Sequence, residues 1–320
     1  MTLGVVVIGR NEGARLVACL ASVKQAAPTA SVVYVDSGST DDSMKAAEAA
    51  GVTALPLDMS IPFTAARARN AGFAALQAAV PDLTLVQFID GDCTLDPDWL
   101  QAAQDFLLGA LDVAIVCGRL REQYPDATIY NRLADAEWDT PVGQTDACGG
   151  IFMIRQNAFT QVDGFRPDLI AGEEPELCLR LRRTDWKIHR LEQEMARHDI
   201  AMTRFSQWWK RTQRAGFTYA QGAALFGDTP GGYTRPALRR ALVWGALLPA
   251  IIFGLALILW PLALLALCVY PAQVFRLQRR GIGWLRAVFL TIGKFAEAQG
   301  ALRYYWARLR DVNTGLVEYK

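Results

Sequence analysis

Residues 241–275 contain no charged side chain, and this stretch of 35 residues limits what the chain can fold into more than any other feature. As one straight helix it would be about 52 Å long, whereas the hydrocarbon core of a bilayer is about 30 Å thick. Pro249, Pro261 and Pro271 disfavour a continuous helix, so we expect two shorter helices joined near Trp260-Pro261. A single steeply tilted helix and a buried pair of core helices are the alternatives.

The charges of the chain are divided unevenly. Arginines flank the uncharged stretch on both sides: Arg239, Arg240, Arg276, Arg279 and Arg280. By the positive-inside rule, we expect both flanks to face the cytoplasm. From residue 236 onward, eleven Lys and Arg outnumber three acidic residues, a charge of +8, and the total of +1 leaves −7 for the first 235 residues. This division predicts an acidic soluble domain followed by a segment that meets anionic lipid.

The six cysteines and the amino terminus bear on the compartment. No two cysteines have the Cys-x-x-Cys spacing, which favours a reducing compartment over a disulfide framework or a zinc site. The first residues lead directly into an apolar run without a basic and then apolar leader, so we expect no signal peptide.

Apolar runs alternate with helical patterns through most of the first 200 residues. Strands are expected at residues 3–8, 32–35, 52–55, 86–89 and 113–117, with helices between most of them. This alternation favours an α/β fold with a doubly wound, mostly parallel sheet. The chain has neither a Gly-x-Gly-x-x-Gly after the first strand nor a Gly-x-x-x-x-Gly-Lys-Ser/Thr, which argues against dinucleotide-dependent redox chemistry and P-loop phosphoryl transfer.

Two carboxylates follow the apolar run at 86–89. Asp90-Gly91-Asp92 comes where a buried strand reaches its carboxyl end, the edge at which open α/β sheets bind ligands. Two acidic groups one residue apart can hold a hard divalent cation, which in turn can hold a diphosphate. Gly91 leaves the backbone there without a side chain. The alternative is a solvated turn, because Asp-Gly is a common turn pair.

Polar residues also follow the second and third strands. Asp36 ends the second strand and is placed to accept a hydrogen bond from a base or ribose at the sheet edge. Ser39 is expected to cap the helix that comes next. Near the start of the helix at 64–79, Arg67 and Arg69 are candidates to bind a phosphate, or are surface residues.

Two further candidates come later in the chain. Gly149-Gly150 precedes an apolar strand and either permits a close approach of backbone to ligand or marks a bulge. Glu173 and Glu174 begin a helix, where acidic residues are favoured by the helix dipole. A carboxylate at the edge of the same sheet can also act as a general base.

The order of these motifs resembles that of glycosyltransferase family 2. The resemblance covers roughly residues 3–198 and rests on Asn11-Glu12, the Asp36-Ser37-Gly38-Ser39 run, Arg69-Asn70-Ala71-Gly72, Asp90-Gly91-Asp92, Gly149-Gly150 and Gly172-Glu173-Glu174. It implies a GT-A fold, a nucleotide-diphosphate sugar as donor, a divalent metal (Mg²⁺ or Mn²⁺) and inversion at the sugar carbon.

The resemblance also implies roles for single residues. Glu12 and Asp36 match the positions that hold the nucleoside, Asp90 matches the ribose or metal neighbour, and Asp92 matches the direct metal ligand. Glu174 stands where the family usually has the aspartate of a Glu-Asp pair, the base that deprotonates the acceptor hydroxyl. Because this chain has glutamate there, both Glu173 and Glu174 remain candidates for the base.

The end of the chain carries further features. His198 follows a strand-like run and is either a structural residue or, as the resemblance suggests, a ligand of the metal or diphosphate. Trp208-Trp209-Lys210-Arg211 suits a lipid headgroup boundary, an acceptor diphosphate or an interfacial helix without a ligand. Residues 282–306 are expected to form an amphipathic helix at the membrane surface, with a third span at 282–292 as the alternative.

These observations lead to one function and two alternatives. We expect a catalytic domain at 1–235 that faces the cytoplasm, and a segment at 236–320 that attaches it to the inner membrane. The enzyme would transfer a sugar to a hydroxyl of a lipid-linked acceptor in surface polysaccharide synthesis, with other assembly proteins as further candidate partners. No nucleic-acid motif occurs. The alternatives are a polyprenyl-phosphate sugar synthase and a non-catalytic sugar-nucleotide-binding scaffold.

Overall fold

The structure is a computed structural model that describes residues 1–229 and 233–310. The chain divides into two compact units, Met1–Ala201 and Met202–Lys320. We call them the first and the second unit and describe each by itself. The expected end of a catalytic domain at residue 235 stays a prediction.

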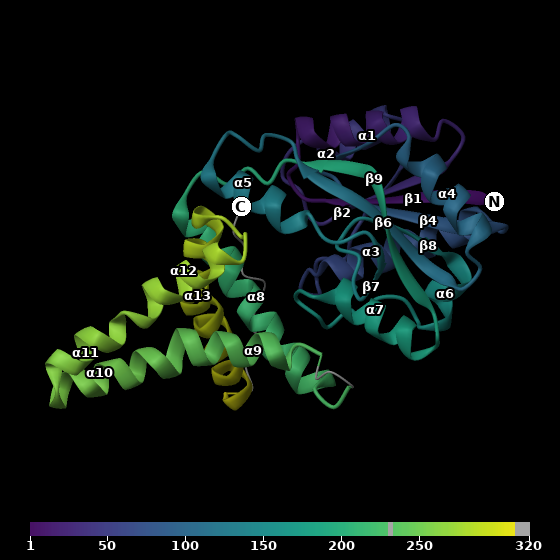
Figure 1. Ribbon diagram of the computed structural model, residues 1–320. Coiled ribbons are helices and arrows are strands. Elements are labelled where there is room, and N and C mark those ends of the chain that lie inside the picture. The colour runs from purple at the N-terminus through teal and green to yellow at the C-terminus, as the bar shows by residue number, and fades with distance from the viewer. Residues whose placement is uncertain (230–232, 311–320) are drawn as a thin grey trace. The chain divides into compact units, whose positions relative to one another are not determined.

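The first unit is a nine-stranded sheet with helices on both faces (Figure 1). Its strands are β1 (Thr2–Gly9), β2 (Ser31–Asp36), β3 (Thr53–Pro56), β4 (Leu83–Asp90), β5 (Cys93–Leu95), β6 (Val113–Glu122), β7 (Gly143–Thr145), β8 (Phe152–Arg155) and β9 (Lys187–His198). Its helices are α1 (Ala14–Ala26), α2 (Ser43–Ala49), α3 (Ala65–Ala79), α4 (Trp99–Gly109), α5 (Ile129–Trp138), α6 (Gln156–Gln161) and α7 (Glu173–Arg183).

The strand order is β3-β2-β1-β4-β8-β6-β9-β5, and β7 pairs with β9. Strands β3, β2, β1 and β4 are parallel, as are β6 and β9, whereas β8 runs antiparallel between β4 and β6. The expected α/β fold is confirmed. Because β8 is antiparallel, its amino end lies at the carboxyl end of β4, so Gly149-Gly150 reaches the edge where Asp90 lies.

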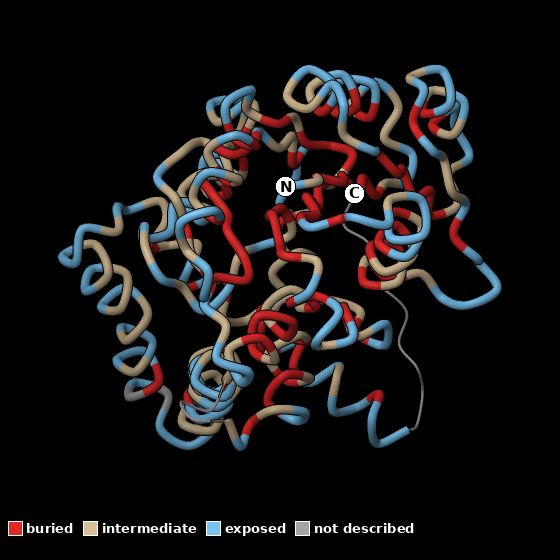
Figure 2. The backbone as a smooth tube through the Cα atoms, turned by 90° about the vertical axis from the view of Figure 1, so that its right-hand side faces the viewer, coloured by how far each residue is buried: buried red, intermediate tan, exposed pale blue. Residues whose placement is uncertain are grey.

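The core lies on both faces of the sheet, as the long apolar runs require. Val5, Val6 and Val7 of β1 are fully buried, and Figure 2 shows buried residues along the inner stretches of the chain. Four phenylalanine rings pack together with centroids 5.4–6.2 Å apart: Phe88, Phe152, Phe159 and Phe165. This packing joins β4 and β8 to the segments that follow β8, beside the edge that carries the motifs.

Side-chain caps fix the starts of two helices. The Thr64 hydroxyl accepts a hydrogen bond from the Arg67 amide at 3.1 Å and starts α3. The expectation that Ser39 caps the next helix is wrong, because α2 begins only at Ser43 and Asp41 Oδ1 accepts from the Ser43 amide at 3.0 Å. The Ser39 hydroxyl donates instead to Asp36, since a buried carboxylate is a stronger acceptor.

The second unit consists of helices in the part that the structure describes. They are α8 (Phe205–Phe226), α9 (Arg235–Leu242), the π-helical turn η2 (Val243–Leu247), α10 (Leu248–Ile258), α11 (Trp260–Leu267), α12 (Val269–Arg279) and α13 (Trp284–Leu309). Helices α9, η2 and α10 form one continuous rod, and the chain turns back at Leu259, so that α10 and α11 lie side by side (Figure 1).

The rod at Arg235–Ile258 is the one helix among the described residues that is long and apolar enough to cross a membrane, by length and composition alone. Its mean hydropathy reaches 2.4, and only 11% of the apolar window is buried. Large apolar side chains are exposed along the hairpin of α10 and α11, with Phe253 at 67%, Leu257 at 73% and Ile258 at 80%.

Helix α13 packs through small residues and through part of its apolar stripe, since the Phe289 ring lies edge-on against Trp208 of α8. A Cβ atom on Gly300 would lie 1.9 Å from the Gln213 carbonyl oxygen, and one on Gly216 would lie 1.9 Å from the Glu297 carbonyl oxygen. Backbones of α8 and α13 therefore touch where these glycines lie. Ile292 and Leu302, from the expected membrane-facing stripe, are exposed, and whether they meet lipid stays a prediction.

Candidate active site

The loops after β1 and β2 are tied together at the carboxyl edge of the sheet. Asn11 has a φ of 56°, which turns its side chain toward the second loop, and its Oδ1 accepts a hydrogen bond from the Thr40 amide at 2.7 Å. In return the Asn11 amide donates to the Ser39 hydroxyl at 2.9 Å, and the Gly13 amide donates to Asp41 at 3.1 Å. The two loops therefore form one preorganised surface.

Asp36 holds the second loop in place through hydrogen bonds. Its buried carboxylate accepts hydrogen bonds from the Tyr34 hydroxyl at 2.9 Å, the Gly38 amide at 3.0 Å, and both the amide and the hydroxyl of Ser39. Burial and the Asp36 hydrogen bond raise the pKa of Tyr34, so this hydroxyl remains a donor. A nucleoside hydroxyl that binds Asp36 would therefore exchange with one of these donors.

Glu12 and Gly91 lie against each other. Glu12 is paired with Arg15 at 2.6 Å, and a Cβ atom on Gly91 would lie 3.5 Å from Glu12 Cγ and 3.2 Å from the Ile8 carbonyl oxygen. The Gly91 amide donates to that same oxygen at 2.8 Å. Glycine thus lets the backbone after β4 lie close to β1 and to the Glu12 side chain.

Arg69 of α3 joins three segments of the site. Its guanidinium donates from Nη1 to Glu173 Oε1 at 2.7 Å, and from Nη2 to Asp90 Oδ1 at 2.8 Å and to the Gly150 carbonyl oxygen at 3.3 Å. The side chain is 3% exposed, and the Glu173 side chain is 8% exposed. Burial lowers the pKa of Arg69, but Asp90 and Glu173 outweigh it, so the net pKa is raised and the guanidinium stays charged.

Two consequences follow from the Arg69 contacts. Both terminal nitrogens of Arg69 already donate to protein acceptors, whereas its buried Nε has no hydrogen-bond partner among the described residues. Arg69 therefore acts as a clamp between β4, the Gly149-Gly150 loop and α7. Gly150 must be small, because a Cβ atom there would lie 3.0 Å from Arg69 Nη2 and 3.3 Å from Asp90 Oδ2. The backbone thus lies close to Arg69 and Asp90, and the expected close approach to a ligand stays a prediction.

Asp90 and Asp92 crowd negative charge at the end of β4. Burial raises the pKa of Asp90, Arg69 opposes this, and the neighbouring Asp92 adds to it. A cation placed between the two carboxylates would relieve this repulsion.

Asp92 and His198 form the clearest ligand pair. Asp92 Oδ2 and His198 Nε2 are 3.1 Å apart, and β5 and β9 hold them together because Cys93 lies opposite His198 in the antiparallel register. Candidate ligand atoms of Asp92, Cys93 and His198 all lie within 4.8 Å of one another. Burial raises the pKa of Cys93 well above its usual value, and a carboxylate suits a hard divalent cation better than a thiol does.

Glu173 and Glu174 differ in what holds them. Glu173 is buried, and its carboxylate forms the ion pair with Arg69. Glu174, the next residue in the first turn of α7, is half-buried. Glu174 interacts electrostatically with both Arg69 and Cys148, which places it at the same edge of the sheet.

The family model of glycosyl transferase family 2 matches residues 4–163, which is half of the chain and includes the β1, β2, β4 and Gly149-Gly150 motifs. The chain belongs to glycosyl transferase family 2. No curated protein matches it.

Solved structures share the fold at low sequence identity. A mannosyltransferase from Pyrobaculum calidifontis, solved with GDP-Man and Mn²⁺, is 17% identical with a TM-score of 0.63, over 96% of this chain and 87% of that one. A TarS fragment from S. aureus is 11% identical with a TM-score of 0.54, over 95% and 91%. Glucosyl-3-phosphoglycerate synthase from Mycobacterium tuberculosis is 19% identical with a TM-score of 0.50, over 69% and 79%. The match to a longer TarS structure covers only 40% of it.

These neighbours confirm the expected GT-A fold for this family member. The structure brings Arg69, Asp90 and Glu173 into one cluster and Asp92 and His198 into another.

The structure also adds residues that the sequence did not single out. The Trp138 ring stacks on the His198 ring with centroids 5.1 Å apart, and buried Glu122 accepts from Asn131 Nδ2 of α5 and from the Ile200 amide. No sequence spacing reveals these contacts, because they depend on where α5 packs against β6 and β9.

Proposed function

We propose that the protein is an inverting glycosyltransferase that moves a sugar from a nucleotide-diphosphate sugar to a hydroxyl of a lipid-linked acceptor in surface polysaccharide synthesis. The observation that carries the proposal is the pairing of Asp92 with His198 at 3.1 Å beside the Asp90–Arg69–Glu173 cluster. A scaffold protein would have no need for a buried acid and an imidazole held together at the ligand-binding edge.

A divalent metal fits the residues present. One carboxylate oxygen and one imidazole nitrogen suit Mn²⁺ or Mg²⁺, and the two acids after β4 supply the negative charge that such an ion offsets. The Pyrobaculum mannosyltransferase was solved with Mn²⁺ and GDP-Man, and the mycobacterial synthase with Mn²⁺ and UDP, and we extend this chemistry to the present chain. When bound, the ion neutralises charge that develops on the departing diphosphate.

The protein's own residues take distinct roles in this proposal. Asp92 and His198 would hold the ion, and Trp138 keeps the His198 ring in its orientation through stacking. Glu12, Asp36 and Gly91 shape the nucleoside site, and Arg69 fixes Asp90 relative to α7. Glu174 takes the proton of the acceptor hydroxyl, because Glu173 is already committed to the buried ion pair with Arg69.

Nucleotide release tests the proposal. Full-length protein in detergent would be given UDP-, GDP- and dTDP-sugars with Mn²⁺ or Mg²⁺, with and without bacterial lipid extract. We expect release that requires lipid and metal, loss of metal binding in Asp92→Asn and His198→Gln, and loss of transfer without loss of donor binding in Glu174→Gln. Glu192→Gln, an exposed acid of the same unit, is the matched control. Donor binding without any release under all conditions would contradict the catalytic proposal.

We further propose that the second unit attaches the enzyme to the inner membrane, with the first unit in the cytoplasm. The support is the exposed apolar hairpin and the arginines at its base, such as Arg240 and Arg276. Sodium carbonate extraction of membranes tests this, because an embedded hairpin resists extraction. Recovery of the full-length protein in the carbonate supernatant would refute the attachment.

A further inference from the structure

Two arginines of the first unit, Arg119 and Arg190, each have a buried donor nitrogen that makes no hydrogen bond within the described residues. Arg190 of β9 is 4% exposed, and its nearest acid, Asp139, is 3.7 Å away, beyond hydrogen-bond distance. Within residues 1–229 and 233–310, its guanidinium makes no hydrogen bond, and its Nε is fully buried. Arg119 of β6 is near enough to Arg190 to interact with it, and its side chain is 15% exposed. Its Nη2 donates to Asp135 at 3.4 Å, whereas its buried Nη1, 3.4 Å from Asp139, lacks a hydrogen-bond partner in the described structure.

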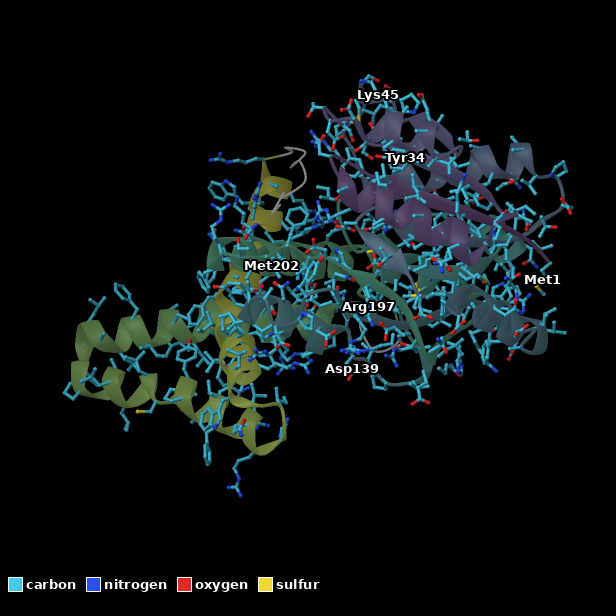
Figure 3. The ribbon with its side chains drawn as sticks, turned by 90° about the horizontal axis from the view of Figure 1, so that it is seen from above. Met1, Tyr34, Lys45, Asp139, Arg197 and Met202 are labelled. Atoms are coloured by element: carbon cyan, nitrogen blue, oxygen red, sulfur yellow. The ribbon has the colours of Figure 1, made fainter. Side chains whose placement is uncertain are left out.

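This arrangement is unfavourable for a protein without a ligand. A buried guanidinium costs free energy unless its donors are satisfied, and two neighbouring guanidinium groups also repel each other. Burial lowers the pKa of Arg119, and Arg190 contributes in the same direction. The one acid shared by both arginines, Asp139, is 65% exposed and therefore largely hydrated (Figure 3).

Two series of contacts connect the arginines to residues of the proposed active site. Asp139 directly follows Trp138, which stacks on His198, so α5 links the arginines to the metal side. On the other side, Arg190 is opposite Cys117 in the β6–β9 register, and Cys117 interacts with Cys178 of α7. The Cys178 sulfur is 3.5 Å from that of Cys148, which interacts with Glu174.

We propose that Arg119 and Arg190 form a binding site for a phosphate group of the acceptor substrate, and that Asp139 is a counter-ion displaced when the phosphate binds. Arginine pairs bind phosphate oxygens through parallel N–H donors, and the unused donors here are in place before the ligand arrives. This inference deepens the proposed function and rests on it, because it concerns the acceptor of that reaction. The phosphate belongs to a lipid-linked acceptor or to a small soluble one.

Inorganic phosphate is the first probe. Its binding to the full-length protein in detergent would be measured by calorimetry with EDTA present, so that no metal-dependent diphosphate site contributes. We expect Arg190→Gln to weaken binding about tenfold or more, the effect of losing a charge-assisted hydrogen-bond donor. Asp139→Asn should tighten binding by up to about fivefold, because an exposed ion pair no longer competes. Arg132→Gln, an exposed arginine of α5 paired with Asp126, is the matched control and should bind as the wild type does.

The Asp139→Asn variant keeps the proposal testable even if Arg190→Gln misfolds, since a merely structural counter-ion would not improve phosphate binding when it is removed. Equal phosphate affinity in the wild type and Asp139→Asn would overturn the proposal, as would equal affinity in a folded Arg190→Gln. Binding of UDP or GDP with Mn²⁺ is measured on the same samples. Nucleotide binding without phosphate binding would refute this inference alone. Phosphate binding without nucleotide binding or release would refute the proposed function, and with it the assignment of the phosphate to an acceptor.

Farnesyl phosphate and glycerol 3-phosphate distinguish the sources of the phosphate. If both compete with inorganic phosphate and farnesyl phosphate binds more tightly, the site takes a lipid-borne phosphate. If glycerol 3-phosphate binds as tightly as farnesyl phosphate, the site takes a soluble phosphorylated acceptor. Both results require that Arg190→Gln weakens the competitor, and competition that ignores this substitution would refute the site.

Discussion

Replacing Arg69 with methionine should destabilise the first unit severely. The substitution removes two donors from a cluster in which Arg69 is 3% and Glu173 8% exposed, at distances of 2.7 Å to Glu173 and 2.8 Å to Asp90. Breaking a buried ion pair by removing one partner costs about 3–5 kcal/mol, because the remaining charge is left uncompensated. Asp90 is 36% exposed and can regain water, so we expect a loss near the lower end of that range, about 3 kcal/mol.

The double variant Arg69→Met with Glu173→Gln isolates the cause. It removes both buried charges, so it should recover part of the loss, with a coupling of about 2 kcal/mol between the two sites. Arg67→Met is the matched control from the same helix, because that guanidinium donates only to backbone carbonyls near the surface, those of Asp58, Ile61 and Pro62.

Hydrogen exchange read by mass spectrometry is the appropriate assay, since a chain of two units need not unfold in one step. Peptides from α3, β4 and α7 report the free energy of opening of the first unit, and peptides from α8 and α13 serve as internal controls. The clamp would be refuted if Arg69→Met lowered the opening free energy of α7 by less than about 1 kcal/mol, or by no more than Arg67→Met does.

Three other substitutions or reactions give sharp outcomes. Gly150→Ala should weaken donor binding while the protein stays folded, because its Cβ atom would lie 3.0 Å from Arg69 Nη2; unchanged nucleotide affinity by calorimetry would contradict this. Gly216→Ala should lower the free energy of unfolding of the second unit by about 1–3 kcal/mol, and with it the melting temperature, since its Cβ atom would lie 1.9 Å from the Glu297 carbonyl oxygen. Gly254 has open space around it, so Gly254→Ala should be neutral or stabilising. Cys268 is exposed on the hairpin, yet a charged maleimide should not label it in intact membranes and should label it after denaturation in SDS; rapid labelling in intact membranes would contradict the membrane proposal.

Much of the first unit follows from local sequence patterns. The runs that end at Asp36 and Asp90 predict strands and place both acids at one edge, because parallel strands share their carboxyl ends. The direction of β8 does not follow, since four apolar residues read the same in a parallel or an antiparallel strand. Its insertion between β4 and β6 is a tertiary choice, and it is this choice that sets Gly150 against Arg69.

Side-chain partners were less predictable than positions. Arg69 has the same appearance in the sequence as Arg67, yet one is a buried clamp and the other lies near the surface, because only Arg69 faces the sheet. Ser39 precedes an expected helix and therefore reads as its cap. In the structure its amide and hydroxyl both donate instead to the buried Asp36 carboxylate, three residues earlier. The small residues of α13 do not by themselves predict which face packs. That face is set by α8, whose Gly216 lies against the α13 backbone where Gly300 of α13 lies against that of α8.

The position of His198 has a consequence for synthesis of the chain. Asp92 leaves the ribosome more than a hundred residues before its partner on β9. During that interval the parallel strands β1, β2, β3 and β4 can pair, but Asp92 has no imidazole beside it. A nascent chain shorter than 198 residues therefore lacks His198. A metal ion can stabilise the first unit through Asp92 and His198 only once β9, its last strand, has been made.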